Sequence, residues 1–338
     1  MRKGGRVVRW WRGLLGAALV LVVGGWALAA PPLDAPYPRP PRPSKAYRLG
    51  ALIPQLANPH FIGMAYGIED EARALGASVV LYDAGGYQFL DKQIAQMEDL
   101  IANRVDAILL VAVSGPGTVP VVEKAYAAHI PVININVMTN SPHVAIRIRS
   151  DDKLLGRKEG ELMDQALGGK GSVVMLKGPA GASPFELRSA GFKEYVAAKT
   201  HIKILGEQNS VNTPDQGLKL MEDFMQTFPK IDGVMCTADF LAIGAAQAIR
   251  AAGKAGSIKI VTVDLQPDAE RLLREGIITG AIVQTAQIMG RWGVRAAINI
   301  LSGRQVPPQL FTPVFVVTKR TVDQVDFTLE RGPVGWKP

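Results

Sequence analysis

The sequence predicts an α/β protein of two similar lobes, each a doubly wound parallel sheet, joined by a hinge of several chain segments. From residue 46 onward, short apolar runs alternate regularly with amphipathic helix patterns. The alternation occurs as two sets of about five units, and such strand–helix–strand units imply right-handed crossovers with helices on both faces of each sheet. About 290 residues follow the N-terminal segments, which is enough for two lobes with separate cores.

The expected elements follow in chain order. The first set of strands is predicted at 48–53, 78–83, 107–113, 132–136 and 144–148. The second set is predicted at 172–177, 203–207, 233–237, 259–264 and 280–285. Amphipathic helix patterns occupy 62–75, 90–103, 119–128, 154–167, 184–199, 216–228 and 242–252. Strands this short and apolar are typical of parallel sheets buried on both faces.

The first thirty residues predict export. They open with a cationic stretch made of Arg2, Lys3, Arg6, Arg9 and Arg12, and residues 14–30 are apolar or small and end on Ala-Leu-Ala-Ala. A basic start, a short apolar run and an Ala-x-Ala end predict a signal peptide at 1–30 that is cleaved on export. The alternative is an uncleaved anchor, because 13–30 reaches the lower limit for a membrane span. Either way, the folded part is expected outside the cytoplasmic membrane, in the periplasm.

Residues 31–45 form a proline-rich linker, with seven prolines between 31 and 43, and are expected to be extended.

Removing the leader leaves 33 basic against 30 acidic residues, so the net charge is +3 instead of +8. This charge gives no reason to expect nucleic acid as a partner. The single cysteine, Cys236, excludes an intrachain disulfide, and four scattered histidines show no ligand spacing. The sequence therefore predicts neither a metal nor a cofactor.

Polar and aromatic residues gather at the carboxyl ends of the predicted strands, where parallel sheets bind ligands. In the first half these are Asn58, Phe61, Tyr87 and Asn136; in the second half they are Asp152, Arg188, Asp264 and Gln284. Asn58 before a proline is equally typical of a helix N-cap, and the acids could be structural ion-pair partners. The glycine-rich stretch 113–117 lacks a G-x-G-x-x-G or Walker pattern, so it does not support nucleotide binding.

These residues resemble the type I periplasmic solute-binding proteins of the ribose and galactose group over roughly residues 46–320. Asn58, Pro59 and Phe61 match an Asn-Pro-x-Phe loop, and 150–152 match a Ser-Asp-(Asp/Asn) helix start. Residues 178–183 match a Gly-x-Ala-Gly-x-Ser stretch that is followed by Arg188, and Asp264 and Gln284 match the strand-end pair that closes the pocket. The resemblance implies a two-lobed binding protein whose ligand contacts these residues.

Two departures distinguish this chain from the usual sugar binders. The Asp-Arg pair expected after the fourth strand is Asn136-Val137 here, and the Asn expected before the second-lobe helix is Ala238.

The stretch 83–87 is similar to the corresponding stretch of the TorT-type sensors. This resemblance implies that the ligand is trimethylamine N-oxide, bound in a box of aromatic residues, and that the partner is a membrane histidine kinase. Tyr87 and Phe61 match two walls of that box by position. Asp152 and Asp264 occupy the positions where the other two aromatic residues of the box would be.

The expected function is capture of a small polar ligand (a sugar, a polyol or a methylated amine such as trimethylamine N-oxide) by closure of two lobes, without catalysis. The expected membrane partner is either an ABC permease or a sensor histidine kinase. The first lobe is expected at 46–149 plus 282–310, the second at 150–281 plus 311–325, and a tail at 326–338, with hinges near 149–150, 280–282 and 309–312. An exported hydrolase is the alternative, although the sequence has no Gly-x-Ser-x-Gly and no histidine near a nucleophile loop.

Overall fold

The computed structural model describes residues 36–338, so the expected signal peptide and the first part of the linker lie outside the described residues. One set of strands comprises β1 (Arg48–Ile53), β2 (Ser78–Asp83), β3 (Ala107–Leu110), β4 (Val132–Ile135), β5 (Ile146–Arg149) and β11 (Gln309–Phe311). The other comprises β6 (Lys170–Lys177), β7 (His201–Asn209), β8 (Gly233–Cys236), β9 (Lys259–Val263), β10 (Gly280–Gln284) and β12 (Val314–Thr318).

The helices alternate with these strands. They are α1 (Pro59–Leu75), α2 (Leu90–Ala102), α3 (Val119–Ala127), α4 (Asp152–Leu167), α5 (Ser183–Lys199), α6 (Pro214–Thr227), α7 (Asp239–Ala251), α8 (Pro267–Glu275) and α9 (Ala286–Leu301). Two 3₁₀ turns follow near the C-terminus, η1 (Val322–Gln324) and η2 (Phe327–Leu329).

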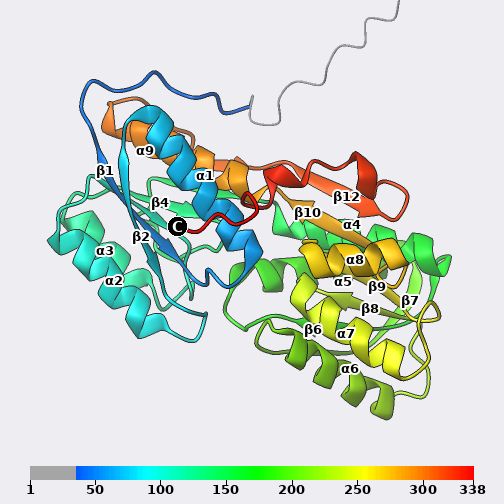
Figure 1. Ribbon diagram of the computed structural model, residues 1–338. Coiled ribbons are helices and arrows are strands. Elements are labelled where there is room, and N and C mark those ends of the chain that lie inside the picture. The colour runs from blue at the N-terminus through cyan, green and yellow to red at the C-terminus, as the bar shows by residue number, and fades with distance from the viewer. Residues whose placement is uncertain (1–35) are drawn as a thin grey trace, which may run out of the picture.

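Each lobe is built on one sheet (Figure 1). The first sheet has the strand order β11-β5-β4-β3-β1-β2 with every pair parallel. The second has the order β12-β10-β9-β8-β6-β7 and is parallel except for the antiparallel pair β10–β12. The predicted fold class, two doubly wound lobes, is confirmed. The edge strands β11 and β12 had no counterpart among the predicted strands.

Alternate residues of each central strand face opposite helix layers, which gives each lobe two cores. In β1, Leu49, Ala51 and Ile53 belong to the core beneath α1 and α9, whereas Leu52 belongs to the core beneath α2 and α3. In the second sheet, Met175 faces α4 and α5, and the residues on either side of it face α6, α7 and α8. This burial on both faces explains why the strands appear in the sequence as uninterrupted apolar runs.

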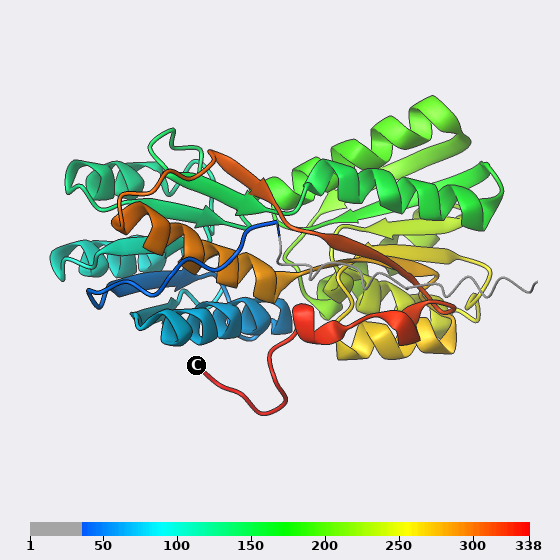
Figure 2. The same ribbon diagram turned by 90° about the horizontal axis from the view of Figure 1, so that it is seen from above.

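Before its C-terminal segment, the described part of the chain passes between the lobes at three places: between β5 and α4, between β10 and α9, and between β11 and β12 (Figure 2). The middle passage differs from the expectation of a hinge at 280–282. Ile282, Val283 and Gln284 still pair with β12 in the second sheet, and α9 packs on the first lobe only after Thr285. The apolar strand continues to the cleft edge, so the first lobe resumes after residue 284 and not at 282.

The second half of the expected linker is held on the first lobe. The backbone carbonyl of Tyr37 accepts a hydrogen bond of 2.6 Å from Arg295, and its ring packs edge-on against Trp292. Arg39 forms an ion pair of 2.7 Å with Glu71 of α1. Residues 36–45 are therefore part of the folded unit and do not act as a free spacer. Between residues 36 and 338 the structure contains no helix long and apolar enough to cross a membrane.

The segment 327–336, expected to be a tail, crosses from the second lobe to the first, and we call it the C-terminal strap (Figures 1 and 2). On the second lobe, Gln266 donates a 3.0 Å hydrogen bond to the carboxyl group of Glu330, which is 1 % exposed. Arg331 forms a 2.7 Å ion pair with Glu270 of α8. These contacts are among buried or part-buried groups, so the strap is part of the folded structure.

The strap also contacts the first lobe. The backbone carbonyl of Glu330 lies so close to α1 that a Cβ placed on Gly63 would be 1.8 Å from its oxygen. Trp336 packs edge-on against Tyr66 of α1 with ring centroids 5.4 Å apart, and Gln287 of α9 donates to a backbone carbonyl of the strap. The strap is therefore a fourth link between the lobes, held to the first lobe by noncovalent contacts alone.

We expect Gly63→Ala to displace the strap without harming α1, because alanine is favoured over glycine inside a helix. The displaced segment should be cut by trypsin at Arg331 roughly tenfold faster, since cleavage follows the population of the open form. Mass spectrometry of timed digests measures this rate. Tyr66→Ala, which leaves the Glu330 contact intact, should have a smaller effect, and an unchanged rate in Gly63→Ala would contradict the proposed seating of the strap.

Candidate ligand site between the lobes

The first side of the site is built by the start of α1. Asn58 is the N-cap, and its side-chain oxygen accepts a 3.0 Å hydrogen bond from the backbone N–H of His60. Pro59 occupies the first helical position, where a missing N–H costs nothing. The cap fixes the loop so that Asn58, His60 and Phe61 all face the space between the lobes. Asn58 therefore both caps α1 and lines the space between the lobes.

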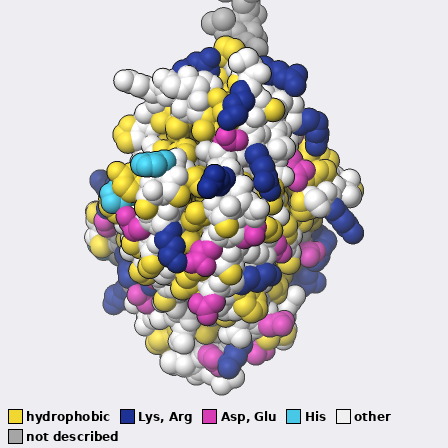
Figure 3. Space-filling model, turned by 90° about the vertical axis from the view of Figure 1, so that its left-hand side faces the viewer, with side chains coloured by type: hydrophobic (Ala, Val, Ile, Leu, Met, Phe, Trp, Pro, Cys, Tyr) yellow, Lys and Arg dark blue, Asp and Glu magenta, His cyan; other side chains and the backbone are white. Residues whose placement is uncertain are grey.

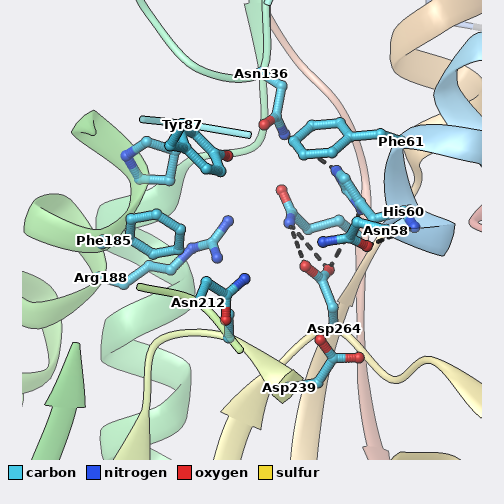
Figure 4. A pocket seen from close by; sticks show the side chains of 13 residues that line it. Asn58, His60, Phe61, Tyr87, Asn136, Phe185, Arg188, Asn212, Asp239 and Asp264 are labelled. Carbon is cyan, nitrogen blue, oxygen red and sulfur yellow. Dashed lines mark hydrogen bonds and ion pairs between the residues drawn. The ribbon is translucent and has the colours of Figure 1, made fainter. Parts of the chain in front are cut away.

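A chain of rings runs around the space and spans both lobes, with Tyr87 and Phe185 on one side and Phe61 and His60 on the other (Figure 4). The ring centroids are 5.3 Å apart for His60 and Phe61, 6.4 Å for Phe61 and Tyr87, and 6.1 Å for Tyr87 and Phe185. Phe185 belongs to α5 of the second lobe, so the Tyr87–Phe185 contact closes the cleft at this side. The backbone N–H of Met138 also donates across the cleft, at 3.2 Å, to the hydroxyl of Ser183. The lobes are thus in a closed arrangement.

Two residues that directly follow a strand line the space, and both adopt a left-handed backbone conformation. Asn136 follows β4 with φ 56°, and Asp264 follows β9 with φ 68°. In each lobe the backbone N–H of this residue donates to the next strand, to Ile148 and Ile282 respectively. The left-handed region is uncommon for residues with a side chain, although Asn and Asp tolerate it best. Equivalent strain in both lobes, at the cleft, is typical of positions held for function.

Arg188 enters from α5 and is fully engaged. Its guanidinium donates to Asp152 at 3.0 and 2.9 Å and to the backbone carbonyl of Thr237 at 2.9 Å. Arg188 and Asp152 are 3 % and 2 % exposed. Burial alone lowers the pKa of Arg188, but the neighbouring carboxylates outweigh it and raise that pKa. Burial also raises the pKa of Asp152, and Arg188 opposes this effect.

A close helix crossing produces this pair. A Cβ on Gly156 of α4 would lie 1.9 Å from the backbone oxygen of Arg188 in α5. Only glycine lets the two helices approach so closely, which brings Asp152 beneath the guanidinium. As a result, Asp152 lies behind Arg188 and outside the set of side chains that line the space, in contrast to its predicted ligand contact.

Acidic groups gather on the side opposite Tyr87 and Phe185 (Figure 4). Asp264 accepts hydrogen bonds of 3.0 and 3.2 Å from the side-chain amide of Gln284, and its carboxylate is 3.8 Å from His60 Nδ1. Asp239 accepts 2.7 Å from the backbone N–H of Gln266. Burial, followed by the charge of Asp264, raises the pKa of Asp239, and burial lowers the pKa of His60.

The strap adds a further carboxyl group to this side. Glu330 places an oxygen within 4.8 Å of ligand atoms of His60 and Asp264, an arrangement of one ring nitrogen and two carboxylates that could hold a metal ion. Burial, together with the charges of Asp264 and Asp239, raises the pKa of Glu330 well above its usual value, and Arg331 opposes this.

Seven of the eight predicted site residues line one small space, in which the centre of a water-sized molecule has about 20 Å³ of room: Asn58, Phe61, Tyr87, Asn136, Arg188, Asp264 and Gln284. The sequence-based selection omitted His60, Phe185, Asn212 and Asp239, which also line the space. Asn212 follows β7, so the strand-end rule applied to the seventh strand would have found it. Phe185 lies in the first turn after the 178–183 loop, where only the approach of the two lobes gives it a role.

Comparison with known proteins identifies the class. The family described as a periplasmic binding protein domain matches residues 49–305, and this chain belongs to that family. The ribose import binding protein of Bacillus subtilis is 28 % identical over 306 residues, which cover 90 % of this chain and 98 % of the relative. The xylitol-binding protein of Mycolicibacterium smegmatis is 30 % identical over 265 residues, 78 % of this chain and 74 % of the relative.

The structural comparison agrees. The substrate-binding protein of a sugar ABC transport system from Bordetella parapertussis matches with a TM-score of 0.86 and 27 % identity, over 91 % of this chain and all of that chain. The periplasmic protein TorT of Escherichia coli is 26 % identical over 302 residues, 88 % of this chain and 86 % of TorT. Both resemblances inferred from the sequence are therefore confirmed at the level of family.

Proposed function

We propose that this chain is an exported solute-binding protein that captures a small polyhydroxylated solute between its lobes and presents the closed form to a membrane partner. The observation that carries the proposal is the convergence of residues from both lobes on one small space, in which amide and carboxyl groups face aromatic rings. Rings stack on the apolar faces of sugars and polyols, while amide and carboxylate groups bind their hydroxyls.

The site favours binding over hydrolysis. None of the described residues that line the space is Ser, Thr, Cys or Lys, so no nucleophile of these four kinds faces a bound molecule there. The relatives that share the fold are binding proteins. The protein is accordingly proposed to act in the periplasm, with residues 1–30 as a cleaved export signal.

Two membrane partners fit this role. We propose an ABC permease as the partner, by analogy with the import and transport proteins among the relatives. A TorT-type sensor function is the second candidate, and the row of Phe61, Tyr87 and Phe185 is the observation that favours it.

The outer end of the first lobe carries basic and acidic side chains intermixed (Figure 3). That face therefore lacks the uniformly positive charge that would attract nucleic acid.

Thermal unfolding of residues 31–338 with a panel of pentoses, hexoses, polyols and trimethylamine N-oxide tests the proposal. Residues 36–45 are retained because they pack on the first lobe. A ligand that binds only the native state stabilises it by about 2.7 kcal/mol at a hundredfold excess over Kd. A shift with sugars or polyols supports uptake or sugar sensing. A shift with trimethylamine N-oxide alone supports the sensor, and no shift with any member contradicts the proposal for these solute classes.

We expect Asp264→Asn to weaken ligand binding about 10- to 100-fold, since a hydrogen bond to a charged group contributes about 1.5–3 kcal/mol. Asparagine has the same shape and tolerates a positive φ, so the unliganded protein should keep its melting temperature. Asp268→Asn is the matched control, because the side chain of Asp268 is 73 % exposed and, among the described residues, its ion pair is with Arg271 of the same helix. Isothermal titration measures both Kd values; an equal effect in the two variants would contradict the role of Asp264.

A further inference from the structure

The charges that line the ligand site are unequal in number. Arg188 is the only Lys or Arg side chain among the described residues that line the space, whereas the carboxyl groups of Asp239 and Asp264 both line it. Arg188 is already neutralised by Asp152, with its remaining hydrogen bond to Thr237. The site therefore carries acidic groups that its arginine does not balance.

Other basic groups near this cluster have partners elsewhere. Arg149 approaches Asp152 at 3.9 Å and lies against the ring of Phe311, behind the site. Arg331 pairs with Glu270 at 2.7 Å and donates to the backbone carbonyl of Leu265. Neither lines the space. Because burial lowers the pKa of His60, its imidazole stays neutral near pH 7 and supplies no balancing charge.

Unpartnered polar atoms show what the ligand must offer. The side-chain oxygens of Gln284 and Asn212, residues 1 % and 9 % exposed, are buried without a hydrogen-bond partner and line the space. Together with Asp264 they are acceptors, so the group that meets them must donate hydrogen bonds. An ammonium group has three donors and no acceptor, whereas a hydroxyl group has one donor.

The rings complete a site for a cation. Tyr87 and Phe185 lie across the space from Asp264, and Phe61 lies above it (Figure 4). A cation near ring faces and next to a carboxylate is stabilised by both, most strongly where water is excluded. The side-chain oxygen of Asn58 caps α1, and the side-chain nitrogen of Asn136 lies 3.3 Å from His60 Nε2 and 3.5 Å from Met289 Sδ. The nitrogen of Asn58 and the oxygen of Asn136 are therefore the amide atoms left for hydroxyl groups. The guanidinium of Arg188 already lies 5.9 Å from the centroid of the Phe185 ring, so Tyr87 and Phe61 are the rings that the proposed cation would meet without sharing them with Arg188.

We propose that the ligand is a protonated primary or secondary amine that also carries hydroxyl groups, an amino-polyol or amino sugar, with its ammonium group against Asp264 and the side-chain oxygen of Gln284. The inference rests on the proposed function and narrows its ligand class. It differs from a neutral sugar by the charge, and from trimethylamine N-oxide by the N–H donors that the unpartnered oxygens require.

Matched ligands test the inference on residues 31–338. Isothermal titration at pH 7 compares 1-amino-1-deoxysorbitol with sorbitol, and glucosamine with glucose; each pair differs by one amine in place of one hydroxyl. We expect the amine of at least one pair to bind tenfold or more tightly than its neutral partner, because charge-assisted hydrogen bonds are roughly twice as strong as neutral ones. In Asp264→Asn that ratio should fall to about one, whereas Asp268→Asn should keep it.

Several results would overturn the inference. Equal or tighter binding of the neutral partner would overturn it and leave the proposed function standing. Binding of trimethylamine N-oxide or glycine betaine but not of the amines would show that ring faces alone select the ligand. Stabilisation of chelator-treated protein by Zn²⁺ or Mn²⁺ alone would assign His60, Asp264 and Glu330 to a metal. Failure of every amine would also overturn it, and the neutral panel would then decide the proposed function separately.

Discussion

Arg188→Met is expected to destabilise the unliganded protein by about 3–5 kcal/mol and to abolish ligand binding. Removing one partner of a buried ion pair leaves an uncompensated charge, and this costs far more than the pair itself contributes. Here Asp152 is 2 % exposed and would retain only Arg149, at 3.9 Å, while the carbonyl of Thr237 would lose its donor. Urea unfolding of the unliganded variant measures the loss of stability.

The double variant Arg188→Met/Asp152→Leu separates folding from binding. It removes both charges, and a well-packed apolar pair of similar volume is often as stable as the buried ion pair it replaces. Most of the lost stability should therefore return, whereas ligand binding should not, since Arg188 lines the space and Asp152 does not. If Arg188→Met unfolds at the same urea concentration as the natural chain, the ion pair between Arg188 and Asp152 does not stabilise the site, contrary to the prediction.

The strands of the lobes could be predicted because each is a short apolar run limited by a helix pattern. The predicted 48–53 and 78–83 coincide with β1 and β2. The site followed from the same pattern, since the carboxyl ends of parallel strands meet at one edge and any polar residue there faces the cleft. Asn136 and Asp264, chosen by this reasoning, both line the space, although both adopt a positive φ for which the sequence gives no signal.

Features that depend on helix packing and on distant contacts could not be predicted. Whether Asp152 faces the ligand or Arg188 is decided by the close approach of α4 and α5 at Gly156, and a single glycine in a helix pattern carries no such information. Glu330 reaches the acidic cluster from the C-terminal strap, more than sixty positions from Asp264, without any local signal. The strand predicted at 280–285 agrees with β10, but the boundary between the lobes was expected at 282 because an apolar strand carries no signal for the residue after which the chain enters the other lobe.

Glu71→Gln is expected to destabilise the protein by about 3 kcal/mol at neutral pH. Burial raises the pKa of Glu71, but hydrogen bonds from Arg39 and Arg295 outweigh burial and lower it from 4.5 to about 2. Because the folded-state pKa lies below the unfolded value, the stabilisation is fully present above about pH 4.5. It is lost as the pH falls towards 2, at about 1.4 kcal/mol for each unit of pKa difference.

The same carboxylate ties the N-terminal linker to the lobe. Arg39 and Arg295 bind one oxygen of Glu71 at 2.7 and 2.9 Å, and Glu71 itself is fully buried beneath them. Urea unfolding between pH 2 and 7 should therefore show a steep loss of stability below pH 4.5 in the natural chain and a flatter profile in Glu71→Gln. Glu194→Gln is the control, because its ion pair with Lys153 is half-exposed and should change stability by less than about 1 kcal/mol. Equal pH profiles for Glu71→Gln and the natural chain would show that the linker contact does not hold the carboxylate in its charged form.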